Sequence, residues 1–312
     1  MGASMIKRVL FALSLAGVFA CSQSVVAADG RLAALKEAHP TQAFGPDGPI
    51  QPAPPPPASV FSLVHYPGAQ GALAAYVTPR PSDGGKRPAI VWITGGDSNT
   101  IDDLWHPADP ANDQTAAAYR KAGVVLMIPS LRGGNDNPGR REGFFGEVDD
   151  VIAAADWLAK QDYVDPARIY LGGHSTGGTL ALLTAESTDR FRAVFAFGPV
   201  ADVRQYGGNY VPPGLSDPTE IRLRSPIYWM ASIQKPTFVI EGADPPSNAE
   251  AVALLAKYPH PPQMQTFLVK GASHFSTLAP INGLLARKIL ADTGPASTIA
   301  LSQAELDALF SH

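Results

Sequence analysis

The protein has 312 residues, of which 45% are hydrophobic and 17% charged, and this is enough apolar material for one sizeable core. A formal net charge of −4 gives it no basic surface of the kind that nucleic acids or anionic membranes attract. The balance favours a small molecule or a peptide as the partner, and it leaves the oligomeric state open.

The N-terminus has the pattern of a bacterial secretory signal. Lys7 and Arg8 precede the mainly apolar run Val9–Ala20, and small residues follow it. The run is shorter than the roughly 20 residues that a membrane-spanning helix needs. We therefore expect export, to the periplasm or the medium.

Two kinds of processing fit this signal. Cleavage after Ala27 or Ala28 would make residues 1–27 a signal peptide, whereas lipidation of Cys21 would attach the protein to the envelope. Cys21 is the only cysteine, so on either route the exported chain carries no disulfide.

Residues 28–59 form a proline-rich arm or linker, which we expect to bury little. The domain proper is expected over residues 60–292, and it begins with two alternating strand-like segments, Val60–Tyr66 and Ala72–Thr78. Short apolar runs then alternate with helix-length stretches: Ile90–Ile93, Val124–Ile128, Ile169–Leu171, Val194–Phe197, Phe238–Ile240 and Phe267–Val269.

Continuous apolar runs are typical of strands that are covered on both faces, so the pattern predicts an α/β fold with a mostly parallel sheet between helices. The clearest helix covers residues 148–159, with Asp149, Asp150 and Asp156 expected to point away from the sheet. The rhythm fails over about residues 200–235, which we interpret as a small cap insertion, and residues 293–312 as a C-terminal helical extension.

The strongest motif is Gly173-His174-Ser175-Thr176-Gly177, directly between the Ile169 strand and a helix-forming run. A serine at such a sharp turn has a strained backbone, and the residues two positions away must be small for the turn to close. The turn exposes the hydroxyl at the carboxyl edge of the sheet, so Ser175 is predicted to be a catalytic nucleophile.

A serine nucleophile needs a base, and in this fold the chain order is serine, acid, histidine. His274 follows the last predicted strand, at the required place. His260 and His312 are the other downstream histidines, one in a proline-rich loop and one at the C-terminus. We predict His274 as the base.

The loop after the Phe238 strand offers two carboxylates as the acid of a triad. Asp244 is the first choice because it is expected on the loop itself, and Glu241, at the end of the strand, is the alternative. Asp202 is a third candidate, but it has the position of a residue that caps a turn.

The Thr176 amide is the expected first donor of an oxyanion hole, and the Gly96 and Asp97 amides after the Ile90 strand are candidates for the second. Arg132 follows the Val124 strand, where it would either line the substrate site or pack against a carboxylate. His174 is expected to face away from the hydroxyl. No metal or cofactor is required.

Several segments resemble the catalytic domain of the prolyl oligopeptidase family, within the α/β hydrolases. They are Ser130–Gly134, Gly146–Asp150, Tyr163–Ile169 and Gly173–Gly178, within a likeness that covers roughly residues 59–292. The resemblance implies an α/β-hydrolase fold and acyl transfer by Ser175, His274 and an acid after the penultimate strand.

The chain also departs from that pattern. Peptidases of the family carry a β-propeller before the hydrolase domain, and they commonly supply a tyrosine to the oxyanion hole where this chain has Asp97, Ser98 and Asn99. Ester and peptide substrates therefore both stay open. The competing hypothesis is a non-catalytic binding protein or envelope lipoprotein that keeps the hydrolase fold.

Overall fold

The computed structural model describes residues 31–45 and 51–311. The expected signal peptide over residues 1–27, the cleavage sites and Cys21 lie outside the described residues. Within the described part, no helix is long and apolar enough to cross a bilayer.

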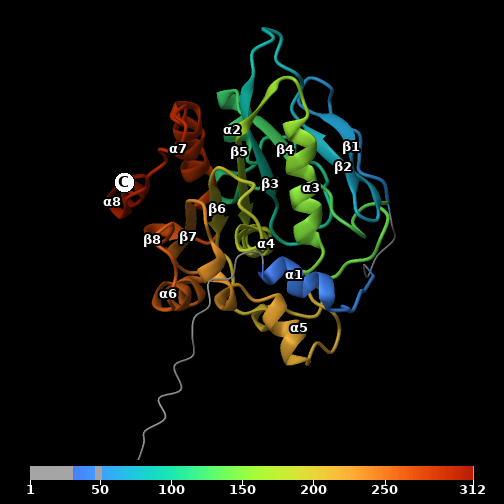
Figure 1. Cartoon of the computed structure of the whole chain (residues 1–312). Helices are drawn as coiled ribbons and strands as arrows, with labels where there is room; N and C mark the ends of the chain where they lie inside the picture. Colours follow the sequence, from blue (N-terminus) through green and yellow to red (C-terminus); the bar gives the residue numbers. More distant parts are fainter. Residues whose placement is uncertain (1–30, 46–50, 312) are drawn as a thin grey trace, which may run out of the picture.

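One mixed sheet organises the chain (Figure 1), in the order β1-β2-β4-β3-β5-β6-β7-β8. The strands are β1 (Ser62–Gly68), β2 (Gly71–Val77), β3 (Arg87–Ile93), β4 (Val125–Pro129), β5 (Val164–His174), β6 (Val194–Phe197), β7 (Thr237–Asp244) and β8 (Met264–Ser273). The pairs β1–β2 and β2–β4 are antiparallel, and every pair from β4 to β8 is parallel. The predicted mostly parallel sheet is confirmed.

Helices cover both faces of this sheet, as predicted (Figure 1). The longer helices are α3 (Glu147–Ala159), α4 (Thr176–Ala185), α6 (Ala249–Lys257) and α7 (Leu278–Ala291), and the shorter ones α1 (Arg31–Ala38), α2 (Ala117–Ala122), α5 (Pro218–Leu223) and α8 (Gln303–Ala308). Buried side chains of α3, α4 and α6 belong to one core cluster, and those of α2, α7 and α8 to the other.

Side chains of a central strand alternate between the two clusters. In β3, Val91 and Ile93 belong to the first cluster, whereas Ile90 and Trp92 belong to the second. The sequence of a strand buried on both faces is a continuous apolar run, because successive side chains point to opposite sides and both sides are covered. Each predicted run overlaps a strand of the sheet.

Three strands extend beyond the apolar runs that predicted them. β5 reaches His174, β7 reaches Asp244 and β8 reaches Ser273. These extra residues are polar or small, so hydrophobicity did not mark them. They carry the ends of the strands to the edge where the candidate catalytic residues lie.

The connection from β6 to β7 contains the region predicted as a cap. It holds α5 and three single 3-10 turns, η2 (Val203–Gln205), η3 (Pro226–Tyr228) and η4 (Met230–Ser232). At the C-terminus, α8 lies beside β8, where Gln303 Nε2 donates to the Leu268 carbonyl at 2.8 Å.

The proline-rich arm packs against the domain, contrary to our expectation that it buries little. Leu32 of α1 is fully buried, Ala53 is buried beneath the second cluster, and the Lys36 ammonium donates to the Phe145 carbonyl. The sequence of α1 does not reveal this contact, because the lysine reaches its partner only in the folded chain.

Glu186, directly after α4, is a buried carboxyl group without a hydrogen-bond partner among the described residues. Burial raises its pKa well above the ordinary value, and the charge of Lys36 offsets this only in part. The folded protein therefore holds a proton that the unfolded chain releases at about pH 4.5.

Glu186→Gln should therefore become more stable relative to wild type as the pH rises. An acid with a raised folded pKa contributes stability that is present below pH 4.5 and lost as the pH climbs through the folded value, by at most about 1.4 kcal/mol per pH unit. Urea unfolding of both proteins at pH 5 and pH 8 measures the difference. An unchanged difference between the two pH values would show that Glu186 is not held protonated.

Candidate active site

Ser175 stands at a strained turn between β5 and α4. Its backbone has φ 55° and ψ −114°, outside the usual regions for a residue with a side chain. A Cβ added to Gly173 would meet the Gly177 carbonyl oxygen at 2.3 Å, and one added to Gly177 would meet the Ile93 oxygen at 2.3 Å. The predicted strand, turn and helix are present. Both positions need glycine because a side chain there would clash with the backbone.

The loop after β3 lies against the start of α4. Thr176 Oγ1 donates to the Gly96 carbonyl at 2.8 Å, and Gly96 has φ +72°, which suits a glycine. The amides of Gly96 and Asp97 have no hydrogen-bond partner within residues 31–45 and 51–311. The Thr176 amide, in the first turn of α4, has none inside the helix. The three predicted donors thus belong to two segments in contact.

His274 follows β8, and Glu241 is its partner. Nδ1 of His274 lies 2.8 Å from Glu241 Oε2, and both side chains are buried. The second carboxylate oxygen, Oε1, accepts from the Gly242 amide at 2.9 Å and from Ser247 Oγ at 3.3 Å. These contacts orient the carboxylate, which in turn orients the imidazole.

Two contacts bring this pair to the elbow. The Ser175 amide donates to the Phe197 carbonyl at 2.8 Å, and the next residue, Gly198, lies against the His274 ring. The ring of His174, directly before the serine, is 4.4 Å from that of His274 between centroids. With Nδ1 facing Glu241, Nε2 of His274 has no hydrogen-bond partner among the described residues, so this nitrogen is available to accept a proton.

Asp244, our first choice as the acid, does not occupy that position. β7 continues to Asp244, which pairs with Ser273 of β8 across a register irregularity and is exposed to solvent. The alternative, Glu241, is the residue whose carboxylate meets His274. We expected the strand to end before Asp244, which would have placed Asp244 on the following loop. Because β7 continues to Asp244, that residue belongs to the strand instead.

The other downstream candidates lie elsewhere. Asp202 caps η2, where it accepts from the Arg204 amide at 2.9 Å and pairs with the Arg204 guanidinium. His260 has its own neighbour, the Pro261 carbonyl at 3.3 Å, and His312 lies outside the described residues.

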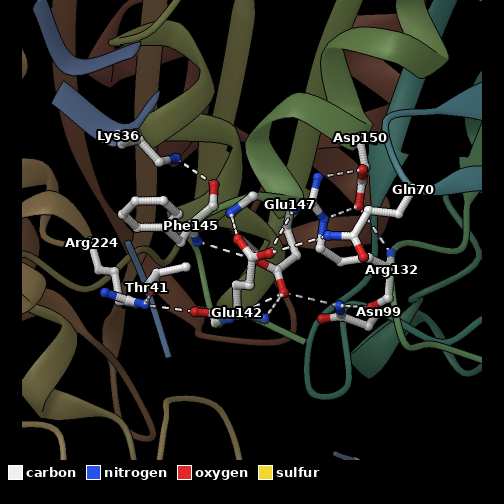
Figure 2. Close-up of polar contacts among 12 residues, drawn as sticks. Lys36, Thr41, Gln70, Asn99, Arg132, Glu142, Phe145, Glu147, Asp150 and Arg224 are labelled. Carbon is white, nitrogen blue, oxygen red and sulfur yellow. Dashed lines mark hydrogen bonds and ion pairs between the residues drawn. The ribbon is translucent and has the colours of Figure 1, made fainter. Parts of the chain in front are cut away.

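Arg132 does not line a substrate site. It is 4% exposed, and its guanidinium contacts Asp150 at 2.8 and 2.9 Å and Glu142 at 2.9 Å (Figure 2). Asp150, which was expected to point away from the sheet, is buried to meet it. The packing role against a carboxylate, the other reading of Arg132, is the one that the structure shows.

Glu147, the first residue of α3, organises the loop beside this pair. Its carboxylate accepts from the backbone amides of Glu142, Gly143 and Phe145 at 2.7 to 3.1 Å and from Asn99 Nδ2 at 3.3 Å (Figure 2). The Asn99 contact ties the loop after β4 to the loop that carries Gly96 and Asp97.

Tyr206, in the region predicted as a cap, is a residue at the site that the sequence analysis did not single out. Its hydroxyl lies 2.8 Å from Thr179 Oγ1, and Ser175 is close enough to act on the pKa of the phenol. Burial raises the pKa of the phenol, so it stays protonated at physiological pH. The signal for Tyr206 was weak, because a tyrosine in an irregular segment has no fixed spacing from the motif.

A cleft of about 1100 Å³ opens beside the Asp97 loop. Its wall includes Asp97, Arg140 and Tyr210, and the Tyr210 ring meets the Tyr206 ring edge to face at 5.8 Å. Through Tyr206, the wall of the cleft is therefore in contact with Thr179 of α4. Among the described residues, no group of three or more histidine, cysteine or acidic side chains is arranged to hold a metal ion.

The middle of the chain is similar in sequence to a known protein family. Residues 110–258 match the prolyl oligopeptidase family, a range that contains Ser175 and Glu241 and ends before His274. The dual function macrocyclase-peptidase POPB of Galerina marginata is 31% identical over 130 residues, which cover 39% of this chain and 17% of that protein. The chain thus spans under a fifth of the length of the curated relatives it first matches.

Solved structures show the fold at lower identity. The 2,6-dihydroxy-pseudo-oxynicotine hydrolase has a TM-score of 0.59 at 15% identity, over 78% of this chain and 72% of that one. An esterase from Pyrobaculum calidifontis has a TM-score of 0.52 at 21% identity, over 75% of this chain and 86% of its own. The predicted α/β-hydrolase fold is confirmed.

The two carboxylates of β7 can be separated by substitution. Glu241→Gln should lower kcat by about 10²-fold to 10⁴-fold, because a neutral amide does not stabilise the imidazolium that forms when His274 takes a proton. Asp244→Asn, the matched control on the same strand, should stay within about twofold of wild type. Ester hydrolysis kinetics distinguish them, and the reverse ranking would restore Asp244 as the acid.

Gly198→Ala should lower kcat at least about tenfold with a modest loss of stability. A Cβ there would lie 2.3 Å from Glu241 Oε2 and 2.5 Å from His274 Cε1, and φ at this position is +55°. Gly207→Ala, in the same connection but in open space, is the control for kinetics and urea unfolding. Equal kcat values for the two variants would mean that the site tolerates the methyl group.

Proposed function

We propose that this chain, which belongs to the prolyl oligopeptidase family, is a serine hydrolase that cleaves ester or peptide bonds through an acyl-enzyme on Ser175. The observation that carries the proposal is the buried contact between His274 and Glu241 beside the strained Ser175 turn. These three residues occur in the chain order that the fold uses, serine, acid and histidine.

The first half-reaction transfers the acyl group to the enzyme. His274 Nε2 takes the Ser175 proton as Oγ attacks the substrate carbonyl, and Glu241 stabilises the imidazolium through Nδ1. The Thr176 amide and an amide of Gly96 or Asp97 donate to the oxyanion. His274 then gives its proton to the leaving alcohol or amine.

Water completes the cycle. His274 accepts a proton from the attacking water, the tetrahedral intermediate collapses, and the Ser175 hydroxyl is regenerated as the acid product leaves. Every proton moves between Ser175, His274, water and the substrate, so the proposed cycle requires no cofactor.

Substrate preference is part of the proposal. The cleft beside Asp97 has apolar rings and exposed charged groups, including Arg140, which suits a substrate that is partly apolar and carries polar groups. Nitrophenyl esters and dipeptide amides of the same acyl group would separate ester from peptide cleavage. We also propose export, on the strength of the basic and apolar pattern at residues 7–20.

Ser175→Ala should lower hydrolysis by about 10³-fold to 10⁶-fold and abolish covalent labelling by a fluorophosphonate. Loss of the nucleophile removes both the attack and the site of modification. Ser187→Ala, beyond the far end of α4, is the control and should label as wild type does. Labelling that persists in Ser175→Ala would refute the nucleophile, and wild-type protein that neither labels nor hydrolyses would favour the non-catalytic binding protein.

A further inference from the structure

We propose that Gln114 and His174 are positioning residues, which fix His274 and the loop after β3 relative to each other. The inference rests on the proposed function, because it assigns a role in the same reaction. It concerns a continuous line of hydrogen bonds behind the catalytic groups, from the Gly95 amide through two side chains to the His274 carbonyl.

The line begins at His274. His174 Nε2 lies 3.0 Å from the His274 carbonyl oxygen, and the His174 side chain is buried. A carbonyl can only accept, so Nε2 of His174 carries the hydrogen. This contact bridges the elbow and the loop after β8.

The other ring nitrogen continues the line. His174 Nδ1 lies 2.9 Å from Gln114 Nε2. Burial, with a further effect from His274, lowers the pKa of His174 to about 3, so the ring is neutral at physiological pH and Nδ1 has a lone pair to accept with. The tautomer of His174 is therefore set by its two neighbours.

Gln114 completes the connection to the loop after β3. Its Oε1 accepts from the Gly95 amide at 3.1 Å, and its Nε2 also donates to Asn112 Oδ1 at 2.7 Å. With Nε2 as the donor, Oε1 is left to accept, so every group in the line has one consistent role. A Cβ on Gly95 would meet His174 Nδ1 at 2.7 Å, which explains the glycine at this position.

Both ends of this line of hydrogen bonds lie next to groups that we propose to act in catalysis. Gly95 directly precedes Gly96 and Asp97, whose amides are the proposed oxyanion donors. The His274 backbone is also held by Thr277 Oγ1, which donates to its carbonyl at 3.1 Å, and by the Pro246 carbonyl, which accepts from its amide at 2.7 Å. Because Thr277 shares the same carbonyl, removal of the His174 contact should loosen His274 without releasing it.

The test uses the full chain with a nitrophenyl ester and a fluorophosphonate. Gln114→Met roughly keeps the volume but removes the contacts to His174, Gly95 and Asn112, and it should lower kcat and the labelling rate by about tenfold with KM within about twofold. His174→Leu should have a similar or larger effect. His174→Gln, which can still place an amide N–H toward the His274 carbonyl, should recover most of the loss.

The double variant Gln114→Met/His174→Leu tests whether the residues act as one unit. It should be no slower than His174→Leu alone, since one broken link already interrupts the line. Urea unfolding separates a structural effect, because a purely structural role would lower stability while leaving kcat and the labelling rate of the folded protein unchanged. Lower stability with unchanged kcat and labelling rate would overturn the inference. It would also be overturned if the losses in kcat of the two single variants added fully in the double variant and His174→Gln recovered no activity.

Failure of this inference is distinct from failure of the proposed function. If Ser175→Ala abolishes labelling while Gln114→Met labels at the wild-type rate, only the positioning role is wrong. If Ser175→Ala labels normally, the nucleophile itself is wrong and the line of hydrogen bonds has no catalytic end.

Discussion

The buried contact between Glu241 and His274 is the interaction on which the rest of the site depends. A carboxylate taken out of water is costly unless hydrogen bonds replace its hydration. Here Glu241 has His274, the Gly242 amide and Ser247 as partners. The surrounding chain makes room for the pair, and Gly198 is the clearest example, because any side chain there would occupy the space of the two catalytic groups.

A second constraint is the close approach of backbones at the elbow. Gly173 and Gly177 allow the strand, the turn and α4 to pack without side chains between them, so Ser175 is held in a conformation that costs about 1–3 kcal/mol. The packed sheet edge and the fully buried side chains of α4 offset that cost. Strain at the nucleophile is thus supported by the apolar core beneath it.

The polar cluster around Glu147 and Arg132 acts at longer range. It joins the loop after β4 to α3 and, through Asn99, to the loop with the proposed oxyanion donors (Figure 2). Lys36 of the arm and Arg224 of the β6–β7 connection contact the same loop through the Phe145 and Glu142 carbonyls. Segments far apart in sequence are therefore fastened to one loop, and the arm is part of the folded domain.

The sequence by itself determined the sheet and the elbow, and it singled out His274 as the proposed base. Short continuous apolar runs are typical of strands covered on both sides, the glycines around Ser175 have a local steric cause, and His274 has the place that the chain order of the fold requires. The tertiary structure decided which carboxylate meets His274, since the choice between Glu241 and Asp244 depends on where β7 ends and on its register with β8. It also decided the partner of Arg132 and the approach of Tyr206 and Gln114, because contacts between distant segments leave no periodic or local pattern in a single chain.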